Sequence, residues 1–461
     1  MFKACKMNKQ KVIKAIEEGN IDAADISFPN FIDDIILKMA NIGLIYNFDD
    51  VVEDKRSSKN STIPLNIIIT LSSTAKMKQM TSLTDIPFAI TDSDVLAELG
   101  WSLYNNNRDM EKGLISCGGI RNFIRHYEAN DFVNFYNDYA QVTMKILNYD
   151  PDLHILDCTK VDVNPKNDNY ENSTTIKDDG DLRRGYKIAS LRGLLDTSGI
   201  IEEIEIGTMK THDLTLSKDI LLNSPALKPG DKIINDKGFL SREIMNKLKT
   251  EREVDTYIPI RKDMEIYKEA VSIAKNKDKE DWNKHPQRKN QIVTSVSKVS
   301  DFWQSDNPDQ DVKLNTCVVY DKKDEEYFVF VTTNLEETAR QVIKTYELRP
   351  EIEEDFRQLK EFWQLEEFKS TKYDQIVFHI VMLLIGYMFY QLYKNTEEGS
   401  EYAGKSLPVI LKKYEPEDKP KKVIIYADDY FGLFKFTKFL DIYTSCSEKI
   451  RKDLKEILDS I

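Results

Sequence analysis

The chain has 461 residues, of which 41% are hydrophobic and 31% are charged. This length corresponds to about three domains, and the composition excludes disordered, collagen-like and disulfide-stapled proteins. The 78 acidic residues outnumber the 65 basic ones, so the formal net charge is −13. This balance argues against a protein that binds nucleic acid over its whole surface, although it allows positive charge to gather on one face.

The cysteines and the N-terminal residues bear on the compartment. Five cysteines lie far apart without a C-x-x-C pair, so the sequence predicts neither a zinc site nor a disulfide framework. The start of the chain, MFKACKMNKQKVIKAIEEGN, lacks the apolar core of a signal peptide. These features predict a protein of the reducing cytoplasm.

Residues 1–150 are predicted to form a helical N-terminal domain. Turn signals occur at Pro64 and Pro87, and the cluster 91–93 is a suitable N-cap for the segment DVLAELGW. Gly118-Gly119 predicts a turn before one helix over 121–147. Such a domain would serve dimerisation or DNA-end binding, and the sequence leaves both open.

From residue 151 the pattern changes to alternating strands and helices. A charged loop is expected at 166–184, and helices at 216–222 and 241–250. The strands are expected at 153–157, 186–196, 200–207, 232–236 and 257–260, with the second and third forming a hairpin. This alternation indicates an α/β fold with a layered sheet.

Residues 261–333 are predicted to interrupt this α/β plan with a mostly β insertion. Helices then resume at 335–348 and 350–363. The segment 376–393 is apolar and long enough to raise the question of a membrane span. Because it contains His379 and Gln391 and has no second counterpart, we expect a helix buried in a large core and no membrane association. The C-terminal segment, 401–461, should hold one strand, 423–427, and a closing helix.

Two aspartates come at the ends of predicted strands. Asp157 ends LHILD and Asp236 ends KIIND. Carboxylates at the ends of neighbouring strands can share a divalent cation, and a third from a facing helix would complete a two-ion site. Aspartates in turns after strands are common for purely conformational reasons, so this pair alone is weak evidence.

A stronger signal is the spacing Y-x2-R-x3-E-x6-K in TYELRPEIEEDFRQLKEFW. It comprises Tyr346, Arg349, Glu353 and Lys360. Pro350 suits the first turn of a helix, so Arg349 should lie at the start of that helix and Tyr346 at the end of the preceding one. Glu353 and Lys360 are two turns apart and share a face. Glu354 and Asp355 are expected to form a solvated acidic face.

This signature, with one Asp in "LDCT" and another in "NDKGF", resembles the DDE transposases of prokaryotic insertion sequences, specifically the branch with a β-strand insertion before the Glu. The resemblance implies an RNase H-like mixed sheet flanked by helices, over residues 151–400 with the 261–333 insertion. It implies that Asp157, Asp236 and Glu353 are catalytic and bind two Mg²⁺ or Mn²⁺ ions. It also implies that Tyr346, Arg349 and Lys360 contact DNA.

The resemblance further implies cut-and-paste transposition by phosphodiester hydrolysis and strand transfer. The DNA partners would be the terminal inverted repeats of the element and its target, with a homodimer in the synaptic complex and a nucleoid-associated location when DNA is bound. The family often has Arg after the second Asp, where this chain has Lys237, which can meet a phosphate only as a point charge.

Two basic patches are candidates for further DNA contact. Residues 275–290 hold six basic against three acidic residues. The second patch contains Arg183, Arg184, Lys187 and Arg192. Either patch could equally be a solvated face. Trp282 and Trp303 could stack on a flipped base, but packing is the expected role of both.

Other readings remain open at this point. The segment IIYADDYF at 424–431 imitates a polymerase metal motif, but a strand followed by an Asp-rich turn is expected instead. A domesticated or inactive relative would bind DNA without cutting it. An RNase H-like nuclease of different purpose would cut without strand transfer.

Overall fold

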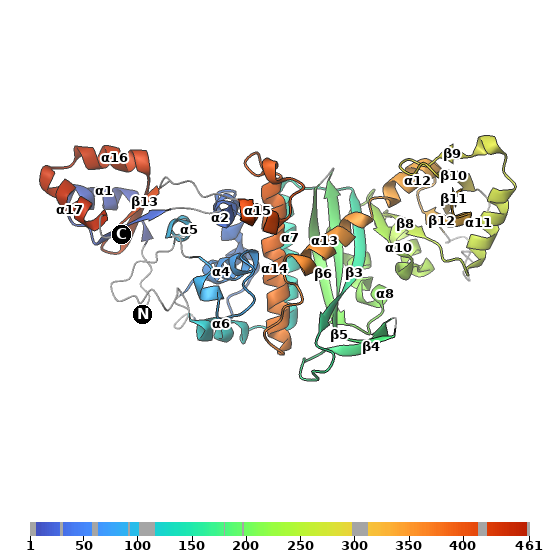
Figure 1. Ribbon diagram of the computed structural model, residues 1–461, viewed down its shortest axis with the longest axis horizontal. Coiled ribbons are helices and arrows are strands. Elements are labelled where there is room, and N and C mark those ends of the chain that lie inside the picture. The colour runs from blue at the N-terminus through green and yellow to red at the C-terminus, as the bar shows by residue number, and fades with distance from the viewer. Residues whose placement is uncertain are drawn as a thin grey trace. The chain divides into compact units, whose positions relative to one another are not determined.

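The computed structural model describes residues 6–27, 31–57, 63–90, 93–100, 116–178, 180–195, 198–296, 312–413 and 422–458 (Figure 1). The chain forms two compact units. The first comprises Met1–Phe135 with Leu359–Ile461, and the second comprises Tyr136–Gln358. The domain boundaries near residues 150 and 400, expected from the sequence, remain a prediction.

The second unit is built on a mixed sheet that contains ten strands among the described residues. Their order is β4-β5-β3-β7-β8-β12-β11-β10-β9, with β6 paired to β5 beside β4. The strands are β3 (Leu153–Val163), β4 (Thr174–Asp178), β5 (Asp181–Leu195), β6 (Ser198–Thr208), β7 (Lys232–Asn235), β8 (Asp255–Pro259), β9 (Asn283–Lys284), β10 (Gln291–Val296), β11 (Asn315–Asp321) and β12 (Glu326–Thr332). β3, β7 and β8 are parallel to one another. β5 is antiparallel to its two neighbours, β3 and β6.

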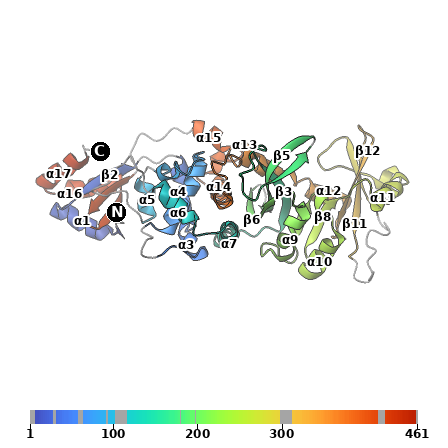
Figure 2. The same cartoon turned by 90° about the horizontal axis from the view of Figure 1, so that it is seen from below.

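Helices cover both faces of this sheet. They are the C-terminal half of α7 (Ala129–Leu147), α8 (Asp213–Leu216), α9 (Lys218–Asn223), α10 (Arg242–Arg252), α11 (Glu265–Lys275), α12 (Ala339–Tyr346) and α13 (Pro350–Glu361). Leu156, Ile233 and Ile258 face a hydrophobic cluster that includes residues of α9, α10 and α11. Figure 2 shows α9 and α10 on the opposite side of the sheet from α13.

Strand alternation places Asp157 on the face that α13 covers. Successive side chains of a strand point to opposite faces, so Asp157 faces away from the cluster that contains Leu156. Across the antiparallel pair, Ser190 lies opposite Asp157 and Arg192 lies opposite Ile155. Asp157 and Arg192 therefore share one face of the sheet.

Several sequence-based expectations in this unit need correction. The loop expected at 166–184 contains β4 and the start of β5. The insertion at 261–333 contains the helix α11 as well as strands. Its strands also extend the main sheet, because β12 pairs with β8. The predicted hairpin is confirmed by the antiparallel pairing of β5 with β6.

The first unit is mainly helical around the apolar helix α14 (Tyr373–Lys394). Its other helices are α1 (Lys9–Glu18), α2 (Phe31–Asn41), α3 (Phe48–Val51), α4 (Leu65–Met77), α5 (Ser93–Glu98), α6 (Cys117–Ile124), the first turns of α7, α15 (Leu407–Lys413), α16 (Phe436–Ser445) and α17 (Glu448–Leu458). The helix predicted over 121–147 is in fact two, since α6 ends at Ile124 and α7 begins at Ala129. Gly118 and Gly119 belong to α6 rather than to a turn before it.

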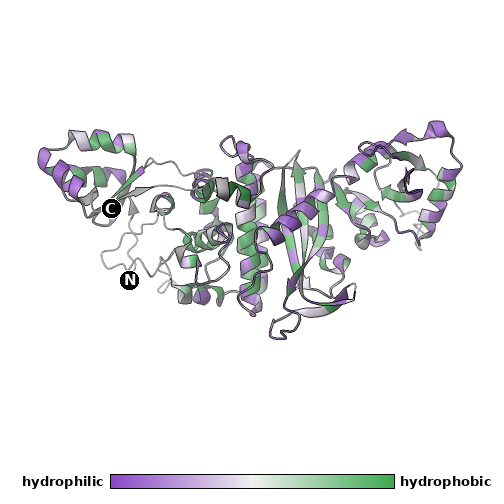
Figure 3. Cartoon of the chain, viewed as in Figure 1, coloured by the Kyte–Doolittle hydropathy of each residue, from purple (hydrophilic) through white to green (hydrophobic). Residues whose placement is uncertain are grey.

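The helix α14 is the core of this unit. Among the described residues it alone is long and apolar enough to cross a membrane, and 94% of its most apolar window is buried inside the protein. Figure 3 shows hydrophobic residues along most of its length. The Phe378 ring lies 5.2 Å from that of Phe132 and 6.1 Å from that of Phe123. The expected buried helix is therefore confirmed.

A small sheet joins the two ends of the chain in the first unit. Its order is β1-β14-β13-β2, from β1 (Lys6–Met7), β2 (Ala23–Ser27), β13 (Lys422–Ala427) and β14 (Tyr430–Lys435). The sequence predicted only one of these strands. Asp428 follows β13 with a φ of 56°, in the turn between β13 and β14. The YADD segment is thus the end of β13 followed by a turn at Asp428 and Asp429, as expected.

Candidate active site

Asp157 lies in the middle of β3 rather than at the end of a strand. The strand continues to Val163, because β5 pairs with it along its whole length. The Asp157 carboxylate is 14% exposed, and its Oδ1 accepts a hydrogen bond of 2.8 Å from the Cys158 backbone N–H. The carboxylate is therefore held close to its own strand, on the α13 face of the sheet.

Asp236 follows β7 directly, as the sequence predicted. β7 is parallel to β3, and Asn235 is in register with Leu156. Asp236 therefore occupies the position next to Asp157 in the register of adjacent strands. It is the N-cap residue of the short 3₁₀ helix Lys237–Phe239.

The third carboxylate comes from the α12–α13 corner. A capping box between Thr338 and Gln341 fixes the start of α12. α12 ends at Tyr346, whose ring lies 4.8 Å from that of Phe330, and α13 begins at Pro350. Arg349 thus lies in the corner, as predicted, and Glu353 lies one turn into α13.

Arg349 joins two of the three carboxylates. Its Nη2 donates to Asp157 Oδ2 at 2.6 Å, and its Nη1 donates to Glu353 Oε1 at 2.5 Å. The guanidinium is 18% exposed, whereas the Glu353 side chain is 51% exposed. The corner therefore presents a carboxylate of β3 and one of α13 to a single cationic group.

The charges of this corner act on the pKa values of Asp157 and Tyr346. Burial raises the pKa of Asp157 to about 6; the charge of Arg349 opposes this shift, and the charges of Asp236 and Glu353 add to it. Burial also raises the pKa of Tyr346. The charge of Arg349 opposes this shift, and the charges of the three carboxylates add to it. Three carboxylates against one guanidinium leave a surplus of negative charge.

A second ion pair fastens α13 to the sheet. Arg192 of β5 donates from Nε to Asp355 Oδ2 at 2.6 Å, and the two side chains are only 5% and 6% exposed. Asp355 is thus buried, which corrects the expectation that it lies on a solvated acidic face. Because Glu353 lies two residues before Asp355, this pair fixes the position of the third carboxylate.

The residues suit a divalent cation by their chemistry. All the donors are oxygens, which Mg²⁺ and Mn²⁺ accept, and the surplus negative charge favours a cation. Asn235, in register with Leu156, points to the opposite face of the sheet and does not join these oxygens. However, within the described ranges no three metal-ligating side chains converge on one point. Arg349 holds Asp157 and Glu353 in the arrangement seen here.

Two predicted DNA-contacting residues lie outside this ion-pair network. Lys237 is exposed immediately after Asp236. Lys360 lies two turns beyond Glu353 on α13, in the first unit, where its ammonium lies 3.6 Å from Glu366.

The basic patch on β5 is largely neutralised. Arg183 binds Asp162 and Asp178, Arg184 binds Asp168, and Lys187 binds Asp213 at 2.6 Å. With Arg192 buried, this patch offers little free positive charge to DNA.

The patch at 275–290 keeps more of its charge in solvent. Lys279, Lys284 and Lys289 are exposed, whereas Arg288 pairs with Glu347 at 3.0 Å. Trp282 packs against the hydrophobic cluster, with its ring 6.4 Å from that of Tyr320, as expected for a packing role. Trp303 lies outside the described residues.

Sequence reasoning missed the roles of Arg192 and Asp355 in the site. One signal was available, because Arg192 interrupts the apolar strand ASLRGLL and a charge at such a position needs a buried partner. Nothing in the sequence pattern identified Asp355 as that partner.

Comparison with known families identifies the family of the chain. The profile described as "Transposase DDE domain" matches residues 148–389, which is more than half of the chain. The protein belongs to the DDE transposase family, and its mixed sheet flanked by helices is the RNase H-like fold expected of that family. Members of the family act on DNA and generally use divalent metal ions. No match was found among curated protein sequences.

Proposed function

We propose that the protein is a cut-and-paste transposase whose catalytic carboxylates are Asp157, Asp236 and Glu353. The observation that carries this proposal is the bridge from Arg349 to Asp157 and Glu353, with Asp236 in the adjacent register position. Asp157 and Arg349, which are 192 positions apart in sequence, meet at one corner, and both belong to the family signature. A solvated charged helix would not bring them together.

In this proposal the three carboxylates hold two divalent ions, Mg²⁺ or Mn²⁺. Ions bound there supply charge neutralisation at phosphate and activation of the attacking oxygen. Arg349 keeps Asp157 and Glu353 together while no metal is bound. When those oxygens coordinate metal instead, the guanidinium is free to bind a phosphate of the end DNA with two parallel hydrogen bonds. Tyr346, Lys237 and Lys360 contribute further DNA contacts.

The proposed reaction has two stages. Water first hydrolyses the phosphodiester at each transposon end and leaves a 3′-hydroxyl. This hydroxyl then attacks a target phosphodiester, so that one bond forms as another breaks and no covalent bond to the protein arises. Two ends must be held at once, for which a homodimer on the terminal inverted repeats is proposed.

The test is cleavage and strand transfer on DNA that carries the element's own terminal repeats. An active enzyme releases the ends and joins them to a target only with Mg²⁺ or Mn²⁺ present. If the protein binds the ends but never cuts, it is a DNA-binding descendant. If it cuts without joining, it is an RNase H-like nuclease.

A further inference from the structure

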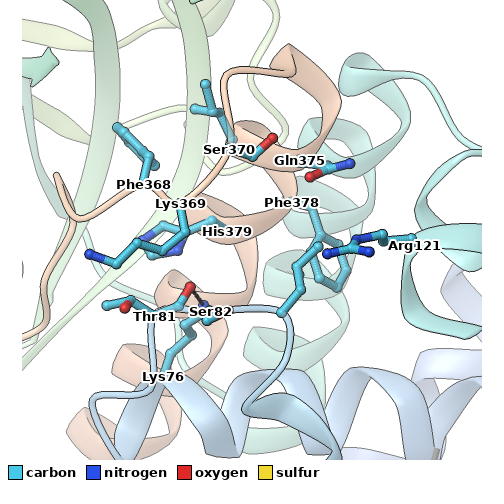
Figure 4. A pocket seen from close by; sticks show the side chains of 12 residues that line it. Lys76, Thr81, Ser82, Arg121, Phe368, Lys369, Ser370, Gln375, Phe378 and His379 are labelled. Carbon is cyan, nitrogen blue, oxygen red and sulfur yellow. Dashed lines mark hydrogen bonds between the residues drawn. The ribbon is translucent and has the colours of Figure 1, made fainter. Parts of the chain in front are cut away.

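A cavity of about 240 Å³ lies within the first unit, apart from the carboxylate corner. Its lining includes three cationic side chains from three elements: Lys76 of α4, Arg121 of α6, and Lys369 in the segment before α14. Figure 4 shows these side chains around the cavity. None of the twelve lining residues is acidic.

Lys76 is the unusual member of this set. Its side chain is 3% exposed, and its ammonium donates to the backbone carbonyls of Met80 at 3.2 Å and Thr81 at 3.5 Å. Within the described part of the chain, no carboxylate forms an ion pair with it. A buried charge without a paired opposite charge is costly, so its presence at a cavity calls for an anionic partner.

The nearest acidic groups do not fill this role. Asp85 is close enough to influence Lys76, but its carboxylate accepts hydrogen bonds from the Ser82 N–H at 3.3 Å and the Thr84 hydroxyl at 3.4 Å. Burial outweighs the charge of Asp85 and lowers the pKa of Lys76 to about 8. Glu367 pairs with Lys369 at 3.2 Å in an exposed position, where such pairs contribute little.

The remaining polar lining suits a group with several acceptor oxygens. Thr81, Ser82 and Ser370 bring hydroxyl groups to the cavity, and Gln375 brings an amide. His379 adds no charge, because burial lowers its pKa well below the usual value and its Nε2 faces the Gln364 carbonyl at 3.3 Å. The cavity therefore combines hydroxyl and amide donors with an unpaired ammonium and a guanidinium.

We propose that this cavity binds a phosphate group, with Lys76 and Arg121 as its cationic ligands. The phosphate belongs either to a DNA backbone or to a free phosphorylated molecule. This inference is independent of the carboxylate triad, so Asp157→Asn should leave phosphate binding at the cavity unchanged.

The test uses the full-length protein, with inorganic phosphate and a short duplex without transposon ends as separate probes. We expect inorganic phosphate to raise the Tm of the wild type and of Arg125→Ala, which removes an exposed arginine four residues from Arg121 that does not line the cavity. Arg121→Ala and Lys76→Met should lose most of this rise. Lys76→Met should in addition raise the Tm without phosphate, since it removes a buried charge, a result that a purely structural lysine would not give.

The duplex distinguishes the two sources of phosphate. If the cavity holds a DNA phosphate, Arg121→Ala weakens duplex binding and lowers the slope of log K against log salt by about 1. If duplex binding is unchanged while the phosphate effect is lost, the source is a free phosphorylated molecule. The proposal would be overturned if Arg121→Ala and Lys76→Met bound phosphate as well as Arg125→Ala does, and bound the duplex as well as Arg125→Ala does.

Discussion

Arg349 donates a hydrogen bond from Nη2 to Asp157 Oδ2 at 2.6 Å, so the guanidinium of the signature arginine lies directly on a proposed catalytic carboxylate. The same group also reaches Glu353. A cationic side chain in this position both holds the carboxylates together and competes with any metal ion for their oxygens. Removal of Arg349 should therefore strengthen metal binding and weaken catalysis.

We predict that Arg349→Ala binds Mn²⁺ more tightly than the wild type in the absence of DNA, because the competing cation is gone. Cleavage of end DNA should nevertheless fall by about tenfold or more, because a donor to phosphate is lost. The Mn²⁺-dependent rise in Tm measures the first effect, since a ligand that binds only the folded state stabilises it.

The matched control is Arg357→Ala on the same helix, where Arg357 pairs with Glu354 at 2.6 Å in an exposed position. It should behave as the wild type in both assays. If Arg349→Ala binds Mn²⁺ no more tightly than this control does, the guanidinium does not compete with the metal ion for the carboxylates.

The buried pair of Arg192 and Asp355 leads to a prediction about stability. Asp355→Asn leaves the buried Arg192 guanidinium with only the half-exposed carboxylate of Glu351, 3.6 Å away, which should cost about 3 kcal/mol of unfolding free energy. Replacing both, as in Arg192→Met with Asp355→Leu, should recover much of this loss. Urea denaturation measures both values, and Glu354→Gln is the control because its side chain is 45% exposed. A loss for Asp355→Asn as small as the control's would show that the pair does not anchor α13.

Gly199 provides an independent probe of the same anchor. A Cβ at this position would lie 2.2 Å from Arg192 Cζ, so Gly199→Ala must displace the guanidinium from Asp355. We expect a lower Tm and a loss of cleavage, because Glu353 moves with α13. The control is Gly118→Ala in α6, where a Cβ meets only Ser116 Oγ at 3.7 Å and alanine favours the helix. Wild-type Tm and activity in Gly199→Ala would contradict this account.

A buried histidine predicts how stability depends on pH. His154 is fully buried, with Nδ1 2.8 Å from Glu202 and Nε2 3.1 Å from Asp231. Burial alone would lower its pKa, but the hydrogen bonds and charges of the two carboxylates outweigh burial and raise the pKa to about 9. Burial also raises the pKa of Glu202. Both ring nitrogens of His154 nevertheless face carboxylate oxygens, so both can donate when the imidazole is protonated.

Because the folded pKa of His154 lies above its ordinary value of 6.5, this stabilisation is complete below pH 6.5 and is lost as the pH rises through 9. The wild type should lose up to about 3 kcal/mol across this window. His154→Gln should be less stable at pH 6.5 and lack this decline, whereas His285→Gln should keep it, since burial lowers the pKa of His285. Urea denaturation at both ends of the window makes the comparison, and an unchanged decline in His154→Gln would exclude His154 as its cause.

The sequence predicted the elements whose signals are local. Pro350 indicated where α13 begins, and Asp236 followed its strand as expected. What it could not predict depends on pairing over long separations. The length of β3 is set by β5, and Asp355 is buried by an arginine 163 residues away. A charged helix face and a buried ion pair have the same local pattern, because only the partner distinguishes them.

The central claim is tested most directly by metal-dependent cleavage of DNA that carries the element's terminal repeats, with the wild type compared to Asp157→Ala, Asp236→Ala and Glu353→Ala. We predict that each of the three variants folds and binds the ends but loses cleavage in Mg²⁺ and in Mn²⁺, while Glu354→Gln cuts as the wild type does. Cleavage that persists in any of the three alanine variants would contradict the assignment of these carboxylates.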